Sequence, residues 1–487
     1  MGLRAKSSGA PTVGVNIGTS LIKVVEARPG KTGVQITALG VAPTPPGTIE
    51  HEVEVAPQTL GQAIRRLIQE SGITCKRSVS SVSGQSSVVV RIIEVPKMTK
   101  QELGETMKWE VERHVPFAAN EVVMDFQPIE RPTTAPDDQN MEVLLAVAQQ
   151  EVINSHLEAL FAAGLDPVVI DVEPLAICRA LIDASPNGAR SQTVAVINIG
   201  AAVTDMAVFQ NGLLTFPRIL PIAGDAITRA LSDGLNISLA QAESLKRERA
   251  AVLLDRAASF SPSMEFESPP AGEDQIPADA TIGMAAPPGE PDAADDVGFI
   301  PGLGFGYGAP SESPAPENAM PDFDVDLGGA PPGTGLDLGE PEDASLGSPE
   351  PKLDLSEPAG GLGGPDVGQA APSDVSASQI AAFTDEQVYD AIAPMLHDLI
   401  VEIRRSLEYY ASRFQSQPDK ILLCGGTSKM KDLDKLLESE LGIPVAIGNP
   451  LENVSVVSRT LSQEYLDEIA SVLTVGVGLA IRDMIGD

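Results

Sequence analysis

Two stretches of the chain share one pattern of apolar and polar positions. Val194 to Asn211 reads VAVINIGAAVTDMAVFQN, which is an apolar strand, a turn containing glycine, a Thr and an Asp, and a second apolar strand. A similar hairpin, VGVNIGTSLIKVVEA, stands at Val13 to Ala27. Short runs rich in β-branched residues and bounded by turn residues are typical of strands. The repeated hairpin predicts a protein built from two related halves.

The block from residue 76 to 147 has a pattern of its own and predicts a small α/β insert. Thr99, with Glu102 three residues later, forms a capping box that starts a helix, and Pro116 ends it. Trp109, the only tryptophan, lies on this helix either as a packing residue or as a residue that binds a partner. The apolar stripe of this helix consists of Leu103, Met107 and Val111. The predicted strands of the insert are residues 87–96, 122–129 and 141–149.

Apolar residues spaced by three and four predict the other helices. Two of them begin at further capping boxes, Ser238 with Gln241 and Thr384 with Gln387. The expected helices outside the insert are residues 57–71, 151–163, 174–184, 241–258, 384–414, 429–441 and 469–482.

Residues 261–380 interrupt this pattern. The segment holds 20 of the 40 prolines, and its 23 acidic residues face a single basic residue, Lys352. Such a composition buries too little apolar surface to offset the entropy of ordering, so a disordered insertion is predicted, together with a disordered N-terminus over residues 1–12. Because capped helices flank the segment on both sides, we expect it to loop out of a folded domain.

The charge outside the insertion is moderate, since the insertion accounts for 22 of the 35 net negative charges. An acidic protein repels phosphate backbones and anionic lipids, so direct binding to nucleic acid or to a membrane is not expected. The three cysteines contain no CxxC motif, and we expect each to be a small buried apolar residue. No secretory signal is evident, and the apolar run 470–484 is shorter than the roughly 20 residues that span a bilayer, so it is predicted to be a buried helix.

Glycine turns between strands let backbone N–H groups approach a phosphate, although many hairpins contain a glycine for geometric reasons alone. A third glycine pair follows a strand and precedes a predicted helix, where a ligand could meet a helix N-terminus. The candidate phosphate-binding residues are Gly18, Thr19, Ser20 and Lys23 in the first hairpin, Gly200, Ala201 and Thr204 in the second, and Gly425, Gly426 and Thr427 at the third site.

The order of these elements resembles the actin-like ATPase superfamily, and more narrowly the PilM family of type IV pilus assembly proteins in its FtsA-like branch. The residues that carry the resemblance are VGVNIGTSLIKVVE, ERHVPF, IDVEPLAICRAL, GDAITRAL, AESLKRE, VEIRRSLEYYASRF, CGGTSKMKDLDKLLESELGIPV and VGLAIR. Together they cover nearly all of the chain outside the insertion and the first dozen residues. The resemblance implies an α/β fold of two duplicated RNase H-like domains around a nucleotide cleft.

The resemblance also implies a division into subdomains. Subdomain 1A would comprise residues 13–75 and 148–190, and 1C, the small insert, residues 76–147. Subdomain 2A would comprise residues 191–235 and 418–487, and 2B residues 236–260 and 381–417.

Site residues follow from the same resemblance. The two hairpins and Gly224 would contact the nucleotide phosphates, while Gly425, Gly426 and Thr427 would contact the adenosine. Glu243, Lys246 and Arg247 would frame the adenosine from one helix face, although a solvated pair of charges on a helix explains the first two equally well. Glu173 would position a water molecule as the catalytic residue.

One departure from the superfamily concerns magnesium. Positions that usually carry Asp are Asn16 and Asn198 here, and a hard cation prefers carboxylate oxygen. We therefore expect ATP or ADP to bind with a weak dependence on Mg²⁺ and to be hydrolysed slowly or not at all. No residue is expected to coordinate the ion directly, and Asn16 and Asn198 would at most lie near it.

The expected partner is the cytoplasmic N-terminal tail of a PilN-like inner-membrane protein, with pilus ATPases or self-association also possible. The protein would then be cytoplasmic and reach the inner membrane only through proteins. The alternatives are an active actin-like ATPase, a small-molecule kinase on the same fold, or an FtsA-like cell-division protein.

Overall fold

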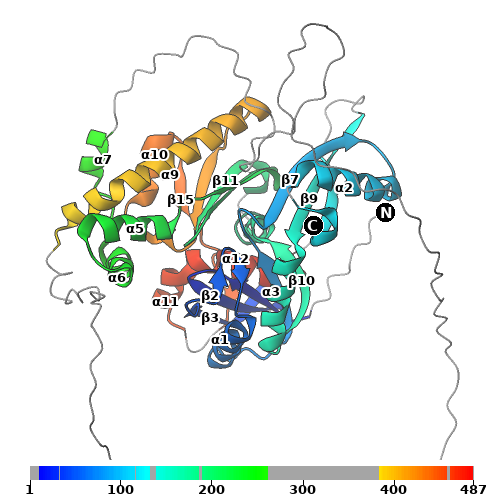
Figure 1. The fold of residues 1–487 in the computed structure, drawn as a ribbon, viewed down its shortest axis with the longest axis horizontal. Coiled ribbons are helices and arrows are strands. Elements are labelled where there is room, and N and C mark those ends of the chain that lie inside the picture. The colour runs from blue at the N-terminus through cyan, green and yellow to red at the C-terminus, as the bar shows by residue number, and fades with distance from the viewer. Residues whose placement is uncertain are drawn as a thin grey trace, which may run out of the picture. The chain divides into compact units, whose positions relative to one another are not determined.

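The fold comes from a computed structural model (Figure 1), which describes residues 10–31, 33–115, 117–131, 139–185, 189–260, 383–457 and 461–485. All of these residues belong to one of two compact units of the chain, the one formed by Met1–Ala286 and Pro372–Asp487. The predicted disorder before residue 10, the helix-ending Pro116 and the predicted insertion 261–380 lie outside the described residues.

Two mixed sheets repeat one arrangement of strands. In the first sheet β1 pairs antiparallel with β2 and parallel with β6, and in the second β11 pairs antiparallel with β12 and parallel with β14. The predicted α/β fold with two related halves is therefore confirmed. The first sheet contains, in spatial order, β10 (Asp166–Val172), β6 (Arg77–Val82), β1 (Thr12–Ile17), β2 (Leu21–Gly30), β3 (Gly33–Pro43) and β16 (Ser455–Val456). The second contains β13 (Leu213–Leu220), β12 (Thr204–Gln210), β11 (Thr193–Ile199), β14 (Lys420–Cys424) and β15 (Val445–Ile447).

The insert is a three-stranded sheet covered by one helix, with a small core of its own (Figure 1). Its elements are β7 (Val88–Pro96), β9 (Asn140–Gln149), β8 (Val122–Ile129) and α2 (Lys100–His114). The capping box of Thr99 and Glu102 is present, and the predicted apolar stripe is buried. Trp109 is 69% exposed, which excludes a core position. One correction applies to the range 76–147: β6 lies within it, but this strand pairs with β1 and β10 in the first sheet.

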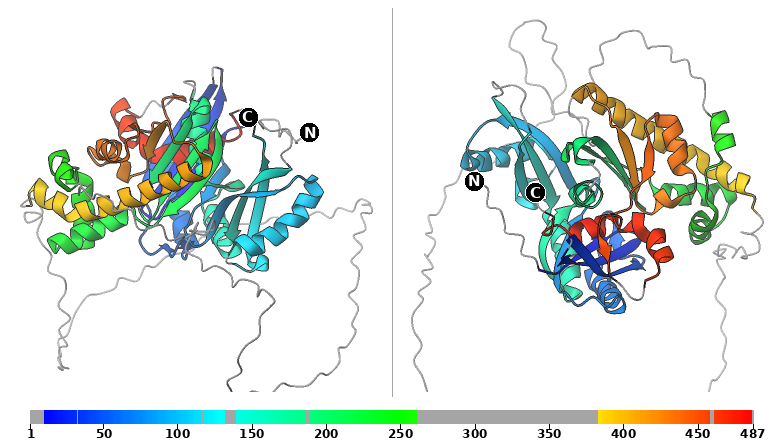
Figure 2. Two further views of the ribbon diagram at one scale, coloured as in Figure 1. Left: turned by 90° about the horizontal axis from the view of Figure 1, so that it is seen from above. Right: turned by 180° about the vertical axis from the view of Figure 1, so that it is seen from behind.

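Three layers of helices pack on the two large sheets. α1 (Pro57–Glu70) and α3 (Gln150–Ala162) share a core with the first sheet. α5 (Gly224–Leu235), α9 (Asp385–Phe414) and α10 (Leu433–Leu441) share another with the second sheet, and Figure 2 shows α9 running across its strands. Between the sheets, α4 (Glu173–Cys178) and α12 (Thr474–Ala480) form a third core with strands of both. The remaining elements are β4 (Ile49–Glu50), β5 (Val53–Glu54), α6 (Leu239–Arg249), α7 (Leu254–Phe260) and α11 (Gln463–Ile469).

The C-terminal apolar run is buried as predicted, but it is not one helix. α11 gives way to a 3-10 turn over Ala470–Leu473 before α12 begins, and every residue of α12 is buried. No helix within the described ranges is long and apolar enough to cross a bilayer. Among the cysteines, Cys178 and Cys424 are buried, but Cys75 is half-buried, with its thiol 3.1 Å from the Pro11 carbonyl oxygen. The expectation of three buried cysteines is therefore wrong for Cys75.

Glycines let α12 touch its neighbours through backbone alone. A Cβ atom at Gly14 of β1 would overlap the carbonyl oxygen of Gly476 and lie 2.6 Å from the amide nitrogen of Ala480. A Cβ atom at Gly478 would overlap the carbonyl oxygen of Ala176 in α4. These contacts hold α12 against the first sheet on one side and against α4 on the other.

Ion pairs join α6 and α7, which precede the insertion, to α9, which follows it. Arg249 pairs with Asp385 at 2.6 Å, and Arg256 pairs with Asp390 at 2.5 Å. Both arginines precede the insertion and both acidic residues follow it. The chain therefore leaves and re-enters the folded unit at one place.

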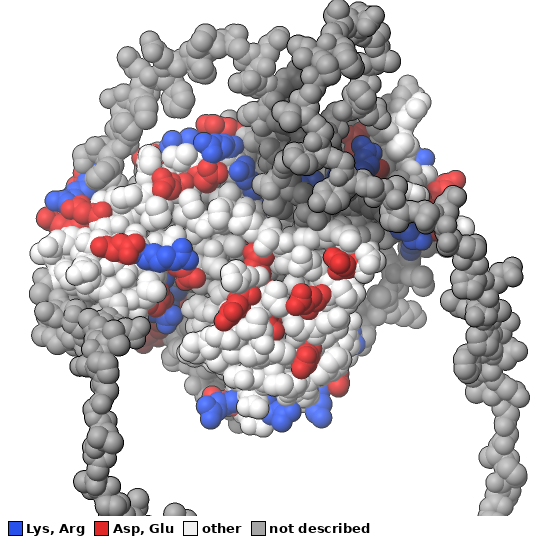
Figure 3. Space-filling model, viewed as in Figure 1, with Lys and Arg blue, Asp and Glu red and all other residues white. Residues whose placement is uncertain are grey.

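Acidic and basic side chains are interspersed over the described surface that faces the viewer in Figure 3. The basic residues on this face do not join into an extended patch. The larger negative excess belongs to residues 261–380.

We predict that Gly478→Ala lowers the thermal unfolding midpoint, because the added methyl group overlaps the Ala176 carbonyl and overpacking typically costs about 1–3 kcal/mol. The matched control is Gly104→Ala in α2, where the nearest atom to the new methyl group is 4.0 Å away. The control is expected to raise the midpoint slightly, since Ala is better than Gly in a helix by about 1 kcal/mol. An unchanged midpoint for Gly478→Ala would contradict the backbone contact.

Candidate functional site

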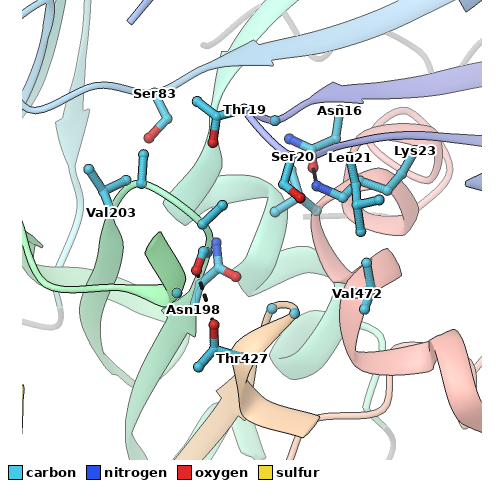
Figure 4. A pocket seen from close by; sticks show the side chains of 18 of the residues that line it. Asn16, Thr19, Ser20, Leu21, Lys23, Ser83, Asn198, Val203, Thr427 and Val472 are labelled. Atoms are coloured by element: carbon cyan, nitrogen blue, oxygen red, sulfur yellow. Dashed lines mark hydrogen bonds between the residues drawn. The ribbon is translucent and has the colours of Figure 1, made fainter. Parts of the chain in front are cut away.

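A cavity of about 480 Å³ lies where the two hairpins face each other (Figure 4). Sixteen residues were assigned to the site from the sequence, and fifteen of them line this cavity. They are Asn16, Gly18, Thr19, Ser20, Lys23, Glu173, Asn198, Gly200, Gly224, Glu243, Lys246, Arg247, Gly425, Gly426 and Thr427. Ala201, the other candidate phosphate-binding residue, lines it too.

Thr204 is the residue that does not line the cavity. It is fully buried at the start of β12, and its hydroxyl donates a hydrogen bond to the carbonyl oxygen of Ile222 at 2.7 Å. The neighbouring residues Val203 and Asp205 line the cavity instead. Thr204 therefore fixes the chain that follows β13 and does not reach a ligand.

The two hairpins have matching turns and matching side-chain positions. The Gly18 amide donates to the Leu21 carbonyl, and the Gly200 amide donates to the Val203 carbonyl, both at 3.0 Å. In the strand register Asn16 lies opposite Lys23, and Asn198 lies opposite Asp205. The same position therefore carries a cation in the first hairpin and a carboxylate in the second.

Glu173, the first residue of α4, lies between the hairpins and is held by both asparagines. The Asn16 amide donates to its Oε1 atom at 2.9 Å, and the Asn198 amide donates to its Oε2 atom at 3.4 Å. Lys23 donates to the side-chain oxygen of Asn16 at 2.9 Å, as Figure 4 shows. An Asp at position 16 or 198 would place a second negative charge against Glu173, whereas an amide donates a hydrogen bond to it.

Burial shifts the charges of this cluster. It raises the pKa of Glu173, an effect that the nearby Lys23 ammonium opposes. It also lowers the pKa of Lys23, here opposed by the attraction of Glu173. Burial raises the pKa of Asp205 well above its usual range, and the negative charge of Glu173 adds to the effect.

Asp205 was not recognised from the sequence. Its carboxylate accepts hydrogen bonds from Asn198 and from Ser83, both at 3.4 Å. It sits inside an apolar strand and resembles an ordinary strand residue in the sequence. Aligning the two hairpins on their asparagines would have revealed it, because Asp205 follows Asn198 at the same spacing as Lys23 follows Asn16.

On the other side of the cavity, Glu243 is fixed by three donors. Lys246 contacts it at 2.6 Å, and Arg247 and the Thr228 hydroxyl contact it at 2.7 Å. Although burial opposes the shift, these hydrogen bonds lower the pKa of Glu243. The Lys246 side chain is only 13% exposed, so Glu243 and Lys246 are not a solvated surface pair. Arg247 also reaches across to the Ser20 hydroxyl at 3.4 Å.

The third glycine site differs from the sequence expectation. Gly425 has φ +88°, and a 3-10 turn over Thr427–Lys429 follows it. α10 begins only at Leu433, after Asp432 in the left-handed conformation with φ +62°. The predicted helix over 429–441 thus starts four residues late, and its N-terminus does not follow the glycines directly.

The described part of the chain contains no group of three or more His, Cys, Asp and Glu side chains that could hold a metal ion. Glu173 and Asp205 are neighbours, but the other polar groups around them are amides, a hydroxyl and Lys23. Lys23 thus offsets the negative charge of Glu173 within the protein.

We predict that Asp205→Asn makes the protein more stable at neutral and alkaline pH. Folding raises the pKa of the Asp205 carboxyl. Such a group stabilises the folded state when the pH is below its pKa in the unfolded state, and this contribution is lost as the pH rises through its pKa in the folded state. The variant should therefore unfold at a higher temperature than the wild type at pH 8, by about 2–4 °C for each kcal/mol recovered. The difference should shrink near pH 4, and a difference independent of pH would contradict the assignment.

Comparisons with known proteins agree with this architecture. The family model of the type IV pilus assembly protein PilM matches residues 14–252, and that of the cell division protein FtsA matches residues 195–465. A solved structure, the PilM–PilN type IV pilus biogenesis complex, contains a chain that is 25% identical, with a TM-score of 0.64, and the match covers 98% of this chain and 99% of that one.

The curated relatives are FtsA proteins. FtsA of Bacillus subtilis (strain 168) is 32% identical over 117 residues, which cover 24% of this chain and 26% of that protein. FtsA of Streptococcus pneumoniae (serotype 2, strain D39) is 23% identical over 253 residues, which cover 48% of this chain and 54% of that protein. The chain thus spans between a quarter and about half of these two relatives. The match to a chain of the PilM–PilN complex spans nearly the full length of both chains, and the chain belongs to the PilM family of type IV pilus assembly proteins, in the FtsA-like branch of the actin-like ATPase superfamily.

Proposed function

We propose that the protein is a nucleotide-binding, actin-like scaffold of the type IV pilus assembly machinery that docks the cytoplasmic tail of a PilN-like inner-membrane protein. The observation that carries the proposal is the single cavity in which both hairpins, α4 and α6 meet. The full-length similarity to a chain of the PilM–PilN complex supports the partner.

The residues of the cavity fit ATP or ADP. A volume of about 480 Å³ falls in the range of small-molecule sites. The glycine turns at Gly18 and Gly200 allow the backbone to approach phosphates, and Lys23 is a half-buried cation that lines the same cavity. A side chain at Gly224 would meet the Thr427 hydroxyl at 2.8 Å, so glycine keeps this wall open.

Roles follow for the lining residues. Residues 18–20, Lys23 and Gly200 would hold the phosphates, and Glu243, Lys246 and Arg247, with residues 425–427, would hold the nucleoside. ATP would supply a phosphoryl group that can be transferred to water. Glu173 is the carboxylate placed between the hairpins where it could orient that water.

The two asparagines favour binding over hydrolysis. An Asn in place of an Asp removes the repulsion between that carboxylate and the nucleotide phosphates. It also removes the attraction of the carboxylate to a cation, which is about 3 kcal/mol for a unit positive charge at about 5 Å and an effective dielectric of 20. Here both amides already donate to Glu173. We infer that nucleotide binding depends only weakly on Mg²⁺ and that turnover is slow or absent.

The insert would provide the docking surface for the tail. β7 and β13 are both edge strands of their sheets and approach each other, so an extended peptide could add to either. In this proposal the protein is cytoplasmic and peripheral to the inner membrane through its partner. The subdomain division given above remains part of the proposal, with the insert beginning at β7. The longer FtsA model match keeps a cell-division role as the second candidate.

We predict that ADP binds in EDTA with an affinity within a few-fold of that in Mg²⁺, measured by titration calorimetry. In the double variant Asn16→Asp with Asn198→Asp, the new carboxylates repel Glu173 and the phosphates, so binding in EDTA should fall by tenfold or more and recover with Mg²⁺. Asn154→Asp, which adds one of these two negative charges on the exposed face of α3, is the control. Rapid Mg²⁺-dependent phosphate release from the wild type, abolished by Glu173→Ala, would overturn the binding-only role.

We predict that an immobilised peptide of the PilN-like N-terminal tail captures the full chain. A variant with residues 88–148 replaced by a short Gly–Ser linker keeps β6 in the first sheet and should lose capture while still binding ADP. Undiminished capture by this variant would exclude the insert as the docking surface.

A further inference from the structure

A second, smaller cavity lies directly behind Glu173. It measures about 40 Å³, room for about one water molecule. Its walls are two edge strands, β7 of the insert and β13 of the second sheet, which face each other without pairing. The walls are mostly apolar, with Val88 and Val90 on one side and Pro217 and Ile219 on the other. We call this the outer cavity, and the 480 Å³ cavity the inner one.

Four residues line both cavities: Val82, Ser83, Glu173 and Asp205. They form a wall one side chain thick between the nucleotide-type site and the gap between the edge strands. Val172 and Pro174, which flank Glu173 in the chain, line the outer cavity as well. A movement of Glu173 at the inner cavity therefore changes the shape of the outer one.

Hydrogen bonds from both hairpins hold the wall. Toward the first hairpin, Asn16 donates to Glu173 at 2.9 Å. Toward the second hairpin, Asn198 donates to Glu173 at 3.4 Å, and Ser83 donates to Asp205 of that hairpin at 3.4 Å. Glu173 and Asp205 also interact directly, so the second hairpin supplies one of the side chains of the wall.

Charges face the wall from both sides. Lys23 faces Glu173 from the inner cavity. Arg91 of β7 and Arg218 of β13 line the outer cavity, and Arg218 pairs with Glu402 at 3.5 Å. The wall thus lies between cations on either side, and a nucleotide would add its negative charge on the Lys23 side only.

We propose that a nucleotide in the inner cavity and the PilN-like tail on the edge strands β7 and β13, which wall the outer cavity, bind with positive cooperativity through this wall. The inference rests on the function proposed above. A nucleotide held between the hairpins fixes their spacing and orders Glu173 and Asp205. The conformational entropy of the walls of the outer cavity is then lost when the nucleotide binds. The tail binds edge strands that are already ordered, so it binds more tightly. By linkage, the tail tightens nucleotide binding by the same factor.

The test measures the affinity of the tail peptide for the full chain by fluorescence anisotropy, with and without saturating ADP. We expect about fivefold or greater tightening with ADP, and the same factor for ADP affinity with and without peptide. Glu173→Ala removes the bridge between the hairpins and should bring both ratios to about one. Glu158→Ala, an exposed carboxylate on α3, should leave both ratios as in the wild type.

Hydrogen exchange gives a readout that needs no peptide. ADP alone should slow amide exchange in residues 88–91 and 218–219 of the wild type, and should not do so in Glu173→Ala. If peptide and ADP each bind but their affinities are independent, the coupling is overturned while the proposed function stands. If the peptide or ADP does not bind at all, the proposed function fails and the coupling fails with it.

Discussion

The packing of α12 through bare backbone determines where the site residues lie. Gly14 of β1 lets the backbone of the helix at Gly476 come into contact with that strand, and Gly478 lets the helix contact α4 at Ala176. α4 begins with Glu173, so its position against α12 also sets the position of this carboxylate between the hairpins. A side chain at either contact would displace α4 and, with it, the residue that links the two halves.

The cluster around Glu173 brings two carboxyl groups, two amides and one ammonium together between the hairpins. The asparagine amides donate hydrogen bonds to Glu173, and Lys23 supplies a positive charge. Lys23 thus offsets one of the two carboxylate charges inside the protein. The two amides also leave the phosphate region less negative than four carboxylates would, which favours retention of an anionic ligand.

Sequence reasoning identified the elements that depend on local signals. The three capping boxes, the buried stripe of α2 and the duplicated hairpins all follow from short-range patterns, and all are present. The errors concern features that tertiary contacts decide. β6 is a short run of serines and valines whose place in the first sheet depends on parallel pairing with β1 and β10. Asp205 gains its importance from Glu173 and Ser83, which are distant in sequence.

The ion pairs beside the insertion have a practical consequence. Arg249 with Asp385, and Arg256 with Asp390, hold together the two segments between which residues 261–380 are inserted. Each doubling of a flexible loop's length costs only about 0.6 kcal/mol in closure entropy. A fluorescent protein spliced between these helices would therefore report the location of the scaffold in living cells without blocking either end of the chain.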